Sequence, residues 1–384
     1  MVVRMTRKSF TVDVEPEVME WAIRTSGYTI EELSKKLKTS ESIIKAWIEG
    51  RKQPTFVQIK NLSKHLKRPI AVFFLPEPPK EKPLPKDYRM LPGREGLFDP
   101  KTILAIRTAR RLQNVSRELA KNLHIDLTPE ISYANLTDNA REWGENYRDL
   151  FKITDFVQKK WRDFYEAFNA LREIIEGRNV LVFQISMPLE DVGGFALADD
   201  IPPVIVVNSK DQMQRRIFTL MHEFAHIILK KEGVDIPEDT LYRTTTNIDI
   251  VEKWCNEFAS EFLLPENVAK TIFNQNRGIL TQTETLNRLS RRYKVSKGML
   301  LYNMRRLNYI TDEEYKKVIE RPKRERSGEG GPPPDIRCIS EKGSKFISLV
   351  SANVNNRFIT LNDALDYLAI KSKHYEKILS TIRG

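Results

Sequence analysis

Residues 217–230 read IFTLMHEFAHIILK, and they place two histidines, His222 and His226, four positions apart in an otherwise apolar segment. The whole chain of 384 residues has only five histidines. On an α-helix, side chains four residues apart lie on the same face, so both imidazoles can reach one metal ion. Glu223 follows the first histidine and would project beside them, toward a water molecule at that metal. The pattern His-Glu-x-x-His therefore indicates a metal site with a general base next to it.

A catalytic zinc site needs a third protein ligand and one open position. The downstream segment VEKWCNEFASEFLLP (251–265) offers Glu252, with Asn256 on the same helical face one turn later. We expect Glu252 to be the third ligand and Asn256 to hold one histidine through its second ring nitrogen. Glu257 is the alternative third ligand, because it points to another side of the same helix. Zinc is assigned from the ligand types, with manganese and iron as alternatives.

These residues resemble the ImmA/IrrE family of zinc metallopeptidases. The resemblance rests on RRIFTLMHEFAHIIL (215–229) followed by VEKWCNEFASEFLLP, and it extends over about residues 178–310. It implies a gluzincin-like site in which His222, His226 and Glu252 hold Zn²⁺ and Glu223 is catalytic. It also implies a specific protein substrate, typically an XRE-type repressor that is cut in response to stress. Cys255 departs from the family pattern, in which alanine is common at this position.

Two further features of a peptidase site are expected around this motif. Tyr242 and Arg243, between the two motifs, are candidates for a second donor to the oxyanion. The apolar run PVIVVN (203–208) is expected to be a strand whose edge pairs with an extended peptide substrate.

The N-terminal stretch TIEELSKKLKTSESIIKAWIEGRKQPT (29–55) predicts two short helices across a tight turn. Thr29 and Glu32 form a capping box, and Ser40 can cap the second helix. This is the plan of a helix-turn-helix, whose second helix enters the major groove of DNA. The stretch resembles the XRE (lambda-repressor-like) family over about residues 17–75. The resemblance implies double-stranded DNA as a partner through residues 29–52, and a homodimer if the DNA site is palindromic.

On this plan the bases face Ser40, Glu41, Ser42, Lys45 and Ala46, and the phosphates face Arg51 and Lys52. The alternative is a protein-docking module without DNA contact, since a phosphate would repel Glu41. Two later stretches, 289–307 and 360–378, repeat the same spacing. We interpret them as helical hairpins used for packing.

Composition sets the remaining expectations. The chain carries 63 Lys and Arg against 52 Asp and Glu, and this net charge of +11 favours a polyanionic partner. No stretch approaches about 18 uninterrupted apolar residues, and no secretory signal is visible at the start, so we expect a soluble cytoplasmic protein without membrane partners. Two isolated cysteines, Cys255 and Cys338, are expected to be reduced thiols.

The expected fold class is α+β and mostly helical, with a lambda-repressor-like helical domain, a zincin-like metallopeptidase domain with a small sheet, and a C-terminal helical domain. Strands are expected at 179–185, 193–198 and 203–208. The boundaries follow Pro-rich and charged breaks. We expect a helix-turn-helix domain at 1–76, a Pro-rich linker at 77–100, a helical connector at 101–177, a metallopeptidase domain at 178–319 with a helical hairpin at 283–310, a flexible linker at 320–335 and a helical domain at 336–384.

The expected function is a zinc-dependent, site-specific endopeptidase that regulates transcription by cleaving an XRE-type repressor or a related partner. The alternative is a DNA-binding regulator or antitoxin-like protein whose metal site is not catalytic. An intact His-Glu-x-x-His motif favours the enzyme, because a pure repressor has no use for Glu223.

Overall fold

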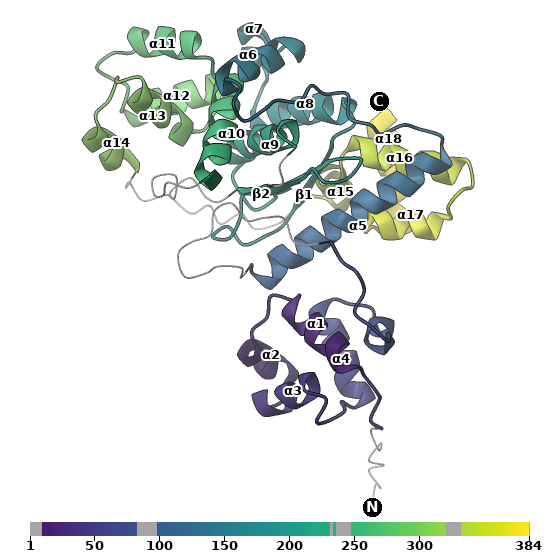
Figure 1. The fold of residues 1–384 in the computed structure, drawn as a ribbon. Helices are drawn as coiled ribbons and strands as arrows, with labels where there is room; N and C mark the ends of the chain where they lie inside the picture. Colours follow the sequence, from purple (N-terminus) through teal and green to yellow (C-terminus); the bar gives the residue numbers. More distant parts are fainter. Residues whose placement is uncertain (1–9, 83–97, 231–232, 236–246, 320–331, 384) are drawn as a thin grey trace, which may run out of the picture. The chain divides into compact units, whose positions relative to one another are not determined.

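The computed structural model describes residues 10–82, 98–230, 233–235, 247–319 and 332–383. These residues form helices and one small sheet, as Figure 1 shows, and the predicted α+β class is confirmed. They divide into two compact units, and the boundary lies within helix α5 (Pro100–Asn122), between Arg107 and Thr108. The predicted linkers fall mostly outside the described residues, since 83–97 and 320–331 are not among them.

The first unit is a small helical domain with one apolar core. Its elements are α1 (Pro16–Arg24), α2 (Ile30–Leu37), α3 (Glu41–Ile48), α4 (Phe56–Leu66) and the short 3-10 helix η1 (Ile70–Phe74). The core includes Met19, Leu33, Ile44, Trp47, Ile59, Leu62 and Phe73.

Local signals in the sequence explain where α2 and α3 begin and end. Thr29 and Glu32 form the predicted capping box at the start of α2. Lys38, with a φ of 53°, ends α2 in the left-handed conformation. Ser40 then accepts a hydrogen bond from the backbone N–H of Ile43 at the start of α3.

The second unit contains the sheet. Its strands are β1 (Leu181–Ile185), β2 (Gly194–Leu197), β3 (Val204–Asn208) and β4 (Gly233–Asp235), and their order is β1-β3-β2-β4. β1 and β3 are parallel, whereas β2 runs antiparallel to both β3 and β4. The first three strands lie at the predicted positions. The prediction that β3 offers an edge to a peptide is wrong, because strands pair with β3 on both of its sides.

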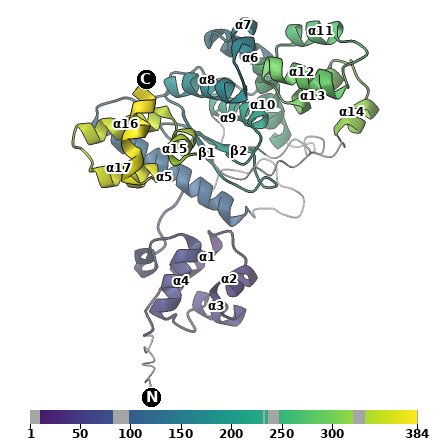
Figure 2. The ribbon, with the colours of Figure 1, turned by 180° about the vertical axis from the view of Figure 1, so that it is seen from behind.

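Helices cover both faces of this sheet. On one face lie α8 (Phe164–Gly177) and α9 (Met213–Ile228), with α10 (Asn247–Leu263) against α9 and α6 (Ala140–Leu150) against α10 (Figures 1 and 2). Val182, Ile205 and Val207 point into this helical core, as expected for alternate strand residues. Phe183 points to the other face and packs edge-to-face on Phe346 of α16 (Ser344–Asn355).

The second unit contains further helices. They are α7 (Asp155–Lys160), α11 (Glu266–Gln275), α12 (Thr283–Tyr293), α13 (Lys297–Arg306), α14 (Asp312–Ile319), α15 (Pro334–Lys342), α17 (Leu361–Leu368), the 3-10 helix η3 (Ser372–His374) and α18 (Tyr375–Arg383). None of the helices in the described ranges combines the length and apolar character that crossing a membrane requires.

A buried ion pair on α8 ties the C-terminal helices to the sheet domain. Arg172 and Glu176 are joined through Nε and Oε1 at 3.1 Å, and both are almost fully buried. Arg172 donates to the carbonyl oxygen of Ser340 at 2.6 Å, and Glu176 accepts from the backbone N–H of Lys345 at 3.1 Å. The predicted boundaries at 177 and 335 therefore do not separate compact units, because α8 and the segment 336–384 share one core.

Gly343→Ala should destabilise this junction. Gly343 has a φ of 78°, and an added Cβ would lie 2.5 Å from Nη2 of Arg172 and collide with the Glu176 carboxylate. We expect a loss of about 2 kcal/mol or more in the free energy of unfolding, measured by urea denaturation. Gly177→Ala is the control, since no atom lies within 4 Å of its Cβ position. The control should be neutral or slightly stabilising, and equal stabilities of the two variants would contradict the role of Gly343.

Candidate metal centre

Helix α9 is buried on nearly all sides, which explains its composition. Every residue from Thr219 to Leu229 is buried, so apolar side chains around most of the helix are required. Within this stretch His222, Glu223 and His226 have no exposed surface. Burying polar groups in an apolar environment costs free energy unless partners compensate them. Burial of these three groups is therefore favourable only with compensating partners, such as a neighbouring carboxylate or a metal ion.

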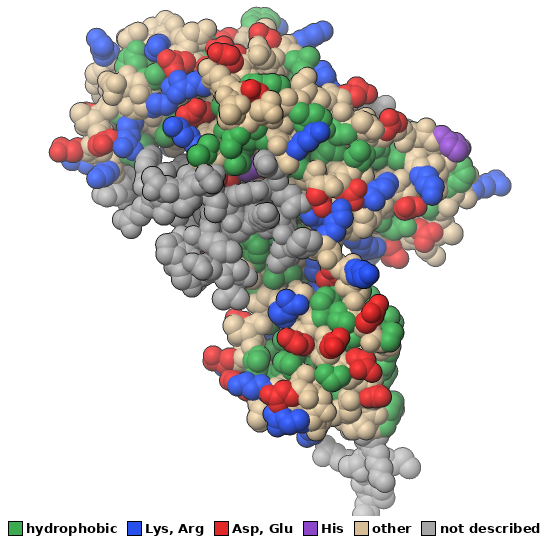
Figure 3. All heavy atoms as spheres, in the orientation of Figure 1, with side chains coloured by type: hydrophobic (Ala, Val, Ile, Leu, Met, Phe, Trp, Pro, Cys, Tyr) green, Lys and Arg blue, Asp and Glu red, His purple; other side chains and the backbone are tan. Residues whose placement is uncertain are grey.

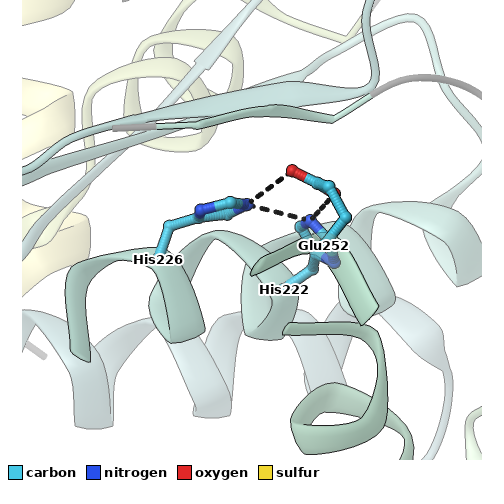
Figure 4. A group of neighbouring side chains, drawn as sticks. All are labelled: His222, His226 and Glu252. Carbon is cyan, nitrogen blue, oxygen red and sulfur yellow. Dashed lines mark hydrogen bonds and ion pairs between the residues drawn. The ribbon is translucent and has the colours of Figure 1, made fainter. Parts of the chain in front are cut away.

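The two histidines converge with a carboxylate from the neighbouring helix (Figure 4). Nε2 of His222 lies 3.2 Å from Oε2 of Glu252, and Nε2 of His226 lies 3.2 Å from Oε1. The two Nε2 atoms are themselves 3.2 Å apart. Each histidine thus faces a different oxygen of the Glu252 carboxylate, and Glu252 is only 4% exposed.

This spacing fits a tetrahedral metal ion. With zinc–ligand bonds of about 2.0–2.1 Å, the edges of a coordination tetrahedron are about 3.3–3.4 Å long. The distance of 3.2 Å between the two Nε2 atoms is close to that length, and one ligand atom from each of the three residues lies within 4.8 Å of the others. The two nitrogens and one carboxylate also form the ligand set that zinc takes in catalytic sites with a fourth, open position.

The electrostatics of Glu252 agree with a charged ligand. Burial opposes ionisation of this carboxyl group, but the adjacent imidazoles of His226 and His222 outweigh burial and hold its pKa well below the ordinary value. Glu252 therefore supplies a negative charge at the point where the two Nε2 atoms meet.

Aromatic packing sets the distance between α9 and α10. Tyr147 of α6 makes edge-to-face contacts with Phe224 of α9 and with Phe258 of α10. Burial raises the pKa of Tyr147 to about 12, and its hydroxyl donates to the carbonyl oxygen of Ser132. Gly144 lets α6 approach α10 closely, because a Cβ there would lie 2.8 Å from the carbonyl oxygen of Phe258.

Strand β2 passes close to the general-base candidate. A Cβ on Gly194 would lie 2.5 Å from Cγ2 of Thr219 and 3.5 Å from Cγ of Glu223. Glycine at this position therefore allows the strand to pack directly on the turn of α9 that carries Glu223. Our sequence reasoning missed this residue, although a glycine at the start of a buried strand is a signal of close backbone approach.

Asn208 organises the loop that leads into β2, a role that no pattern in the sequence indicates. Its fully buried side chain accepts a hydrogen bond from the N–H of Met187 at 3.1 Å and donates to the carbonyl oxygen of Val192 at 2.9 Å. It also accepts from the N–H of Lys210 at 3.1 Å. One amide thus links both ends of the loop between β1 and β2 with the end of β3.

The other predicted site residues have different outcomes. No hydrogen bond from Asn256 to His222 is present in the described structure, so its supporting role stays a prediction. Glu257 is not part of the converging group, and Cys255 lies in the apolar core. Tyr242 and Arg243 lie outside the described residues.

The residues predicted to face DNA lie on the surface of the first unit. Ser40, Glu41, Ser42, Lys45, Arg51 and Lys52 are exposed, and Ala46 is half-buried. Two of the cations have acidic partners, since Lys45 lies 3.9 Å from Glu41 and Arg51 pairs with Glu49. Contact of these residues with DNA stays a prediction.

Comparison with known proteins places the centre within a peptidase-like segment. Residues 175–305 match the family model described as the IrrE N-terminal-like domain of a peptidase family. This segment contains the converging His222, His226 and Glu252, and it leaves the first unit and the C-terminal helices outside. The comparison with curated proteins gave no match.

Glu252→Ala should weaken zinc binding by at least about 100-fold, because it removes one of three donors. Titration of the chelated and dialysed protein with zinc, followed by calorimetry, measures the affinity. Glu257→Ala, five residues later on the same helix, is the matched control and should bind like the parent. Equal weakening in both variants would show that damage to α10, and not loss of a ligand, caused the effect.

Proposed function

We propose that this chain is a zinc-dependent endopeptidase, with His222, His226 and Glu252 as the metal ligands and Glu223 as the general base. The observation that carries the proposal is the convergence of one ligand atom each from His222, His226 and Glu252 within 4.8 Å of one another, with the buried Glu223 next to His222 in the sequence. The match of residues 175–305 to a peptidase family supports it.

The chain's own residues have distinct tasks in peptide hydrolysis. Bound zinc would polarise the scissile carbonyl and make a water molecule more acidic. Glu223 takes a proton from the attacking water and returns it to the leaving amine. His222 and His226 must be neutral to present Nε2 as a ligand. The apolar residues around α9 exclude bulk water, which strengthens the electrostatic interactions within the site.

We further propose that the substrate is a regulatory protein, such as an XRE-type repressor, and that its cleavage changes transcription. The pair of capped helices α2 and α3, with an exposed second helix, supports a chain that meets DNA or a DNA-binding partner. The second candidate function is a DNA-binding regulator with a non-catalytic metal site. The buried Glu223, which directly follows His222 in the His-Glu-x-x-His motif, favours the enzyme.

Glu223→Gln should retain zinc but cleave about 10²- to 10⁴-fold more slowly, because the amide cannot accept the proton. The assay incubates the full chain with a repressor of the XRE type encoded beside it, and follows the fragments by mass spectrometry. Chelation should stop cleavage by the parent protein, and zinc should restore it.

The controls separate the two candidate functions. Glu257→Gln changes the same functional group on α10 and should cleave like the parent. Loss of zinc from Glu223→Gln would indicate a structural role for Glu223. Zinc binding and operator binding by the parent, without any cleavage, would support the regulator.

A further inference from the structure

Helices α12 and α13 repeat the local geometry of α2 and α3. Lys294 ends α12 with a φ of 55°, as Lys38 ends α2 with a φ of 53°. Two residues later, Ser296 and Ser40 cap the following helices. The two hairpins can therefore be compared position by position, with residue 33 corresponding to residue 289.

The second helix of this hairpin is more buried than α3 at two of the matching positions. Ser296 is 6% exposed and Leu301 is 3% exposed, whereas their counterparts Ser40 and Lys45 lie on the surface. Leu301 belongs to the same apolar core as α9, although Lys297 stays exposed. α13 therefore keeps only part of the surface that α3 offers, and the exposed face of this hairpin lies mainly on α12.

The exposed face of α12 is strongly basic, unlike that of α2. In α2 the corresponding positions hold Glu31, Glu32, Lys35 and Lys36, whose formal charges cancel. In α12 they hold Asn287, Arg288, Arg291 and Arg292. The two hairpins thus share a backbone design but differ by three positive charges on this face.

Few carboxylates neutralise the basic segment around α12. Residues 276–306 contain eight Lys and Arg and a single acidic residue, Glu284. Arg305 pairs with Asp312 and Arg306 with Glu266. Among the described residues, no carboxylate forms an ion pair with Arg288, Arg291 or Arg292.

These arginines lie together on the surface. Arg288, Arg291 and Arg292 line one open hollow with Asn287 and Glu284. Arg288 also donates to Oδ1 of Asn276 at 2.6 Å, which brings the end of α11 beside this face. In Figure 3, Lys and Arg side chains are visible in the region where Figure 1 labels α12.

The side chains on this face of α12 indicate which class of macromolecule it can bind. Guanidinium groups bind phosphate oxygens in a bidentate geometry, and closely spaced cations suit a polyanion of high charge density. A protein interface would need apolar or aromatic anchors, but Tyr293 is buried and Ile279 is the one large apolar residue exposed in the described segment 276–306. Single-stranded nucleic acid would need exposed aromatic rings for stacking, which this segment does not offer.

We propose that the exposed face of α12 binds the phosphate backbone of double-stranded DNA without reading its sequence, through Arg288, Arg291 and Arg292. The contact is independent of the metal centre and of the residues predicted in α3. It adds a second DNA-binding surface to the chain, located in the segment that resembles a peptidase.

The test compares salt-dependent DNA binding by variants of the full chain. Fluorescence anisotropy with a labelled duplex of unrelated sequence, about 20 base pairs long, gives the affinity at several salt concentrations. Changing Arg288, Arg291 and Arg292 together to Gln should weaken binding at least about tenfold and reduce the salt slope by up to about 3, since each lost phosphate contact removes about 0.9. Lys371→Gln with Lys373→Gln removes two exposed cations outside both predicted DNA-facing surfaces, and it should change the affinity less than about twofold.

A variant that is expected to bind DNA more tightly is a control for misfolding, because a misfolded protein would not gain affinity. Glu284→Gln removes the one carboxylate that lines the hollow and should tighten DNA binding by about twofold or more. An unchanged salt slope in the triple variant, or an equal effect of the Lys371→Gln and Lys373→Gln control, would overturn the proposal. So would a triple variant that loses binding to polyglutamate but not to DNA, because the partner would then be an acidic polypeptide.

Discussion

The burial of three polar side chains on one apolar helix is the constraint on which the second unit depends. His222, Glu223 and His226 have no exposed surface, and α9 is enclosed by the sheet on one side and α10 on another. Removing these groups from water is unfavourable unless a charged partner compensates them. Glu252 from α10 supplies part of that compensation. A metal ion at the meeting point of the three donors would supply the rest.

Such a centre needs exact distances between elements that are far apart in the sequence. Two glycines permit the closest approaches: Gly194 where β2 crosses α9, and Gly144 where α6 meets α10. Tyr147 contacts aromatic rings on both α9 and α10, and this packing fixes the separation of the two helices. Asn208 fixes the loop before β2 through hydrogen bonds to backbone groups. The site is therefore supported by residues that carry no reactive chemistry themselves.

Local sequence patterns predicted the positions of the helices and strands well. They did not predict which segments distant in the sequence pair with each other. Helix capping by Thr29 and Ser40, and the metal-binding spacing of His222 and His226, depend on neighbours within one helical turn. Glu252 could be ranked above Glu257 from its position on α10, but its distance to the histidines depends on how α10 packs. The interior position of β3 could not be predicted, because strand order depends on contacts among segments distant in the sequence. The buried Arg172–Glu176 ion pair, which joins the C-terminal helices to α8, could not be predicted for the same reason.

The repeated hairpin shows why a local pattern predicts shape better than role. The same left-handed turn and serine cap give α2–α3 and α12–α13 one geometry, yet two positions that are exposed in α3, Ser40 and Lys45, are buried in α13 as Ser296 and Leu301. The distribution of charged residues is a second difference between the two hairpins. Residues 178–275 carry nine Lys and Arg against fifteen Asp and Glu, whereas the following segment 276–306 carries eight against one. A polyanion is therefore attracted to α12 and repelled by the rest of the peptidase-like segment, so nucleic acid bound there would leave the metal centre to a protein substrate.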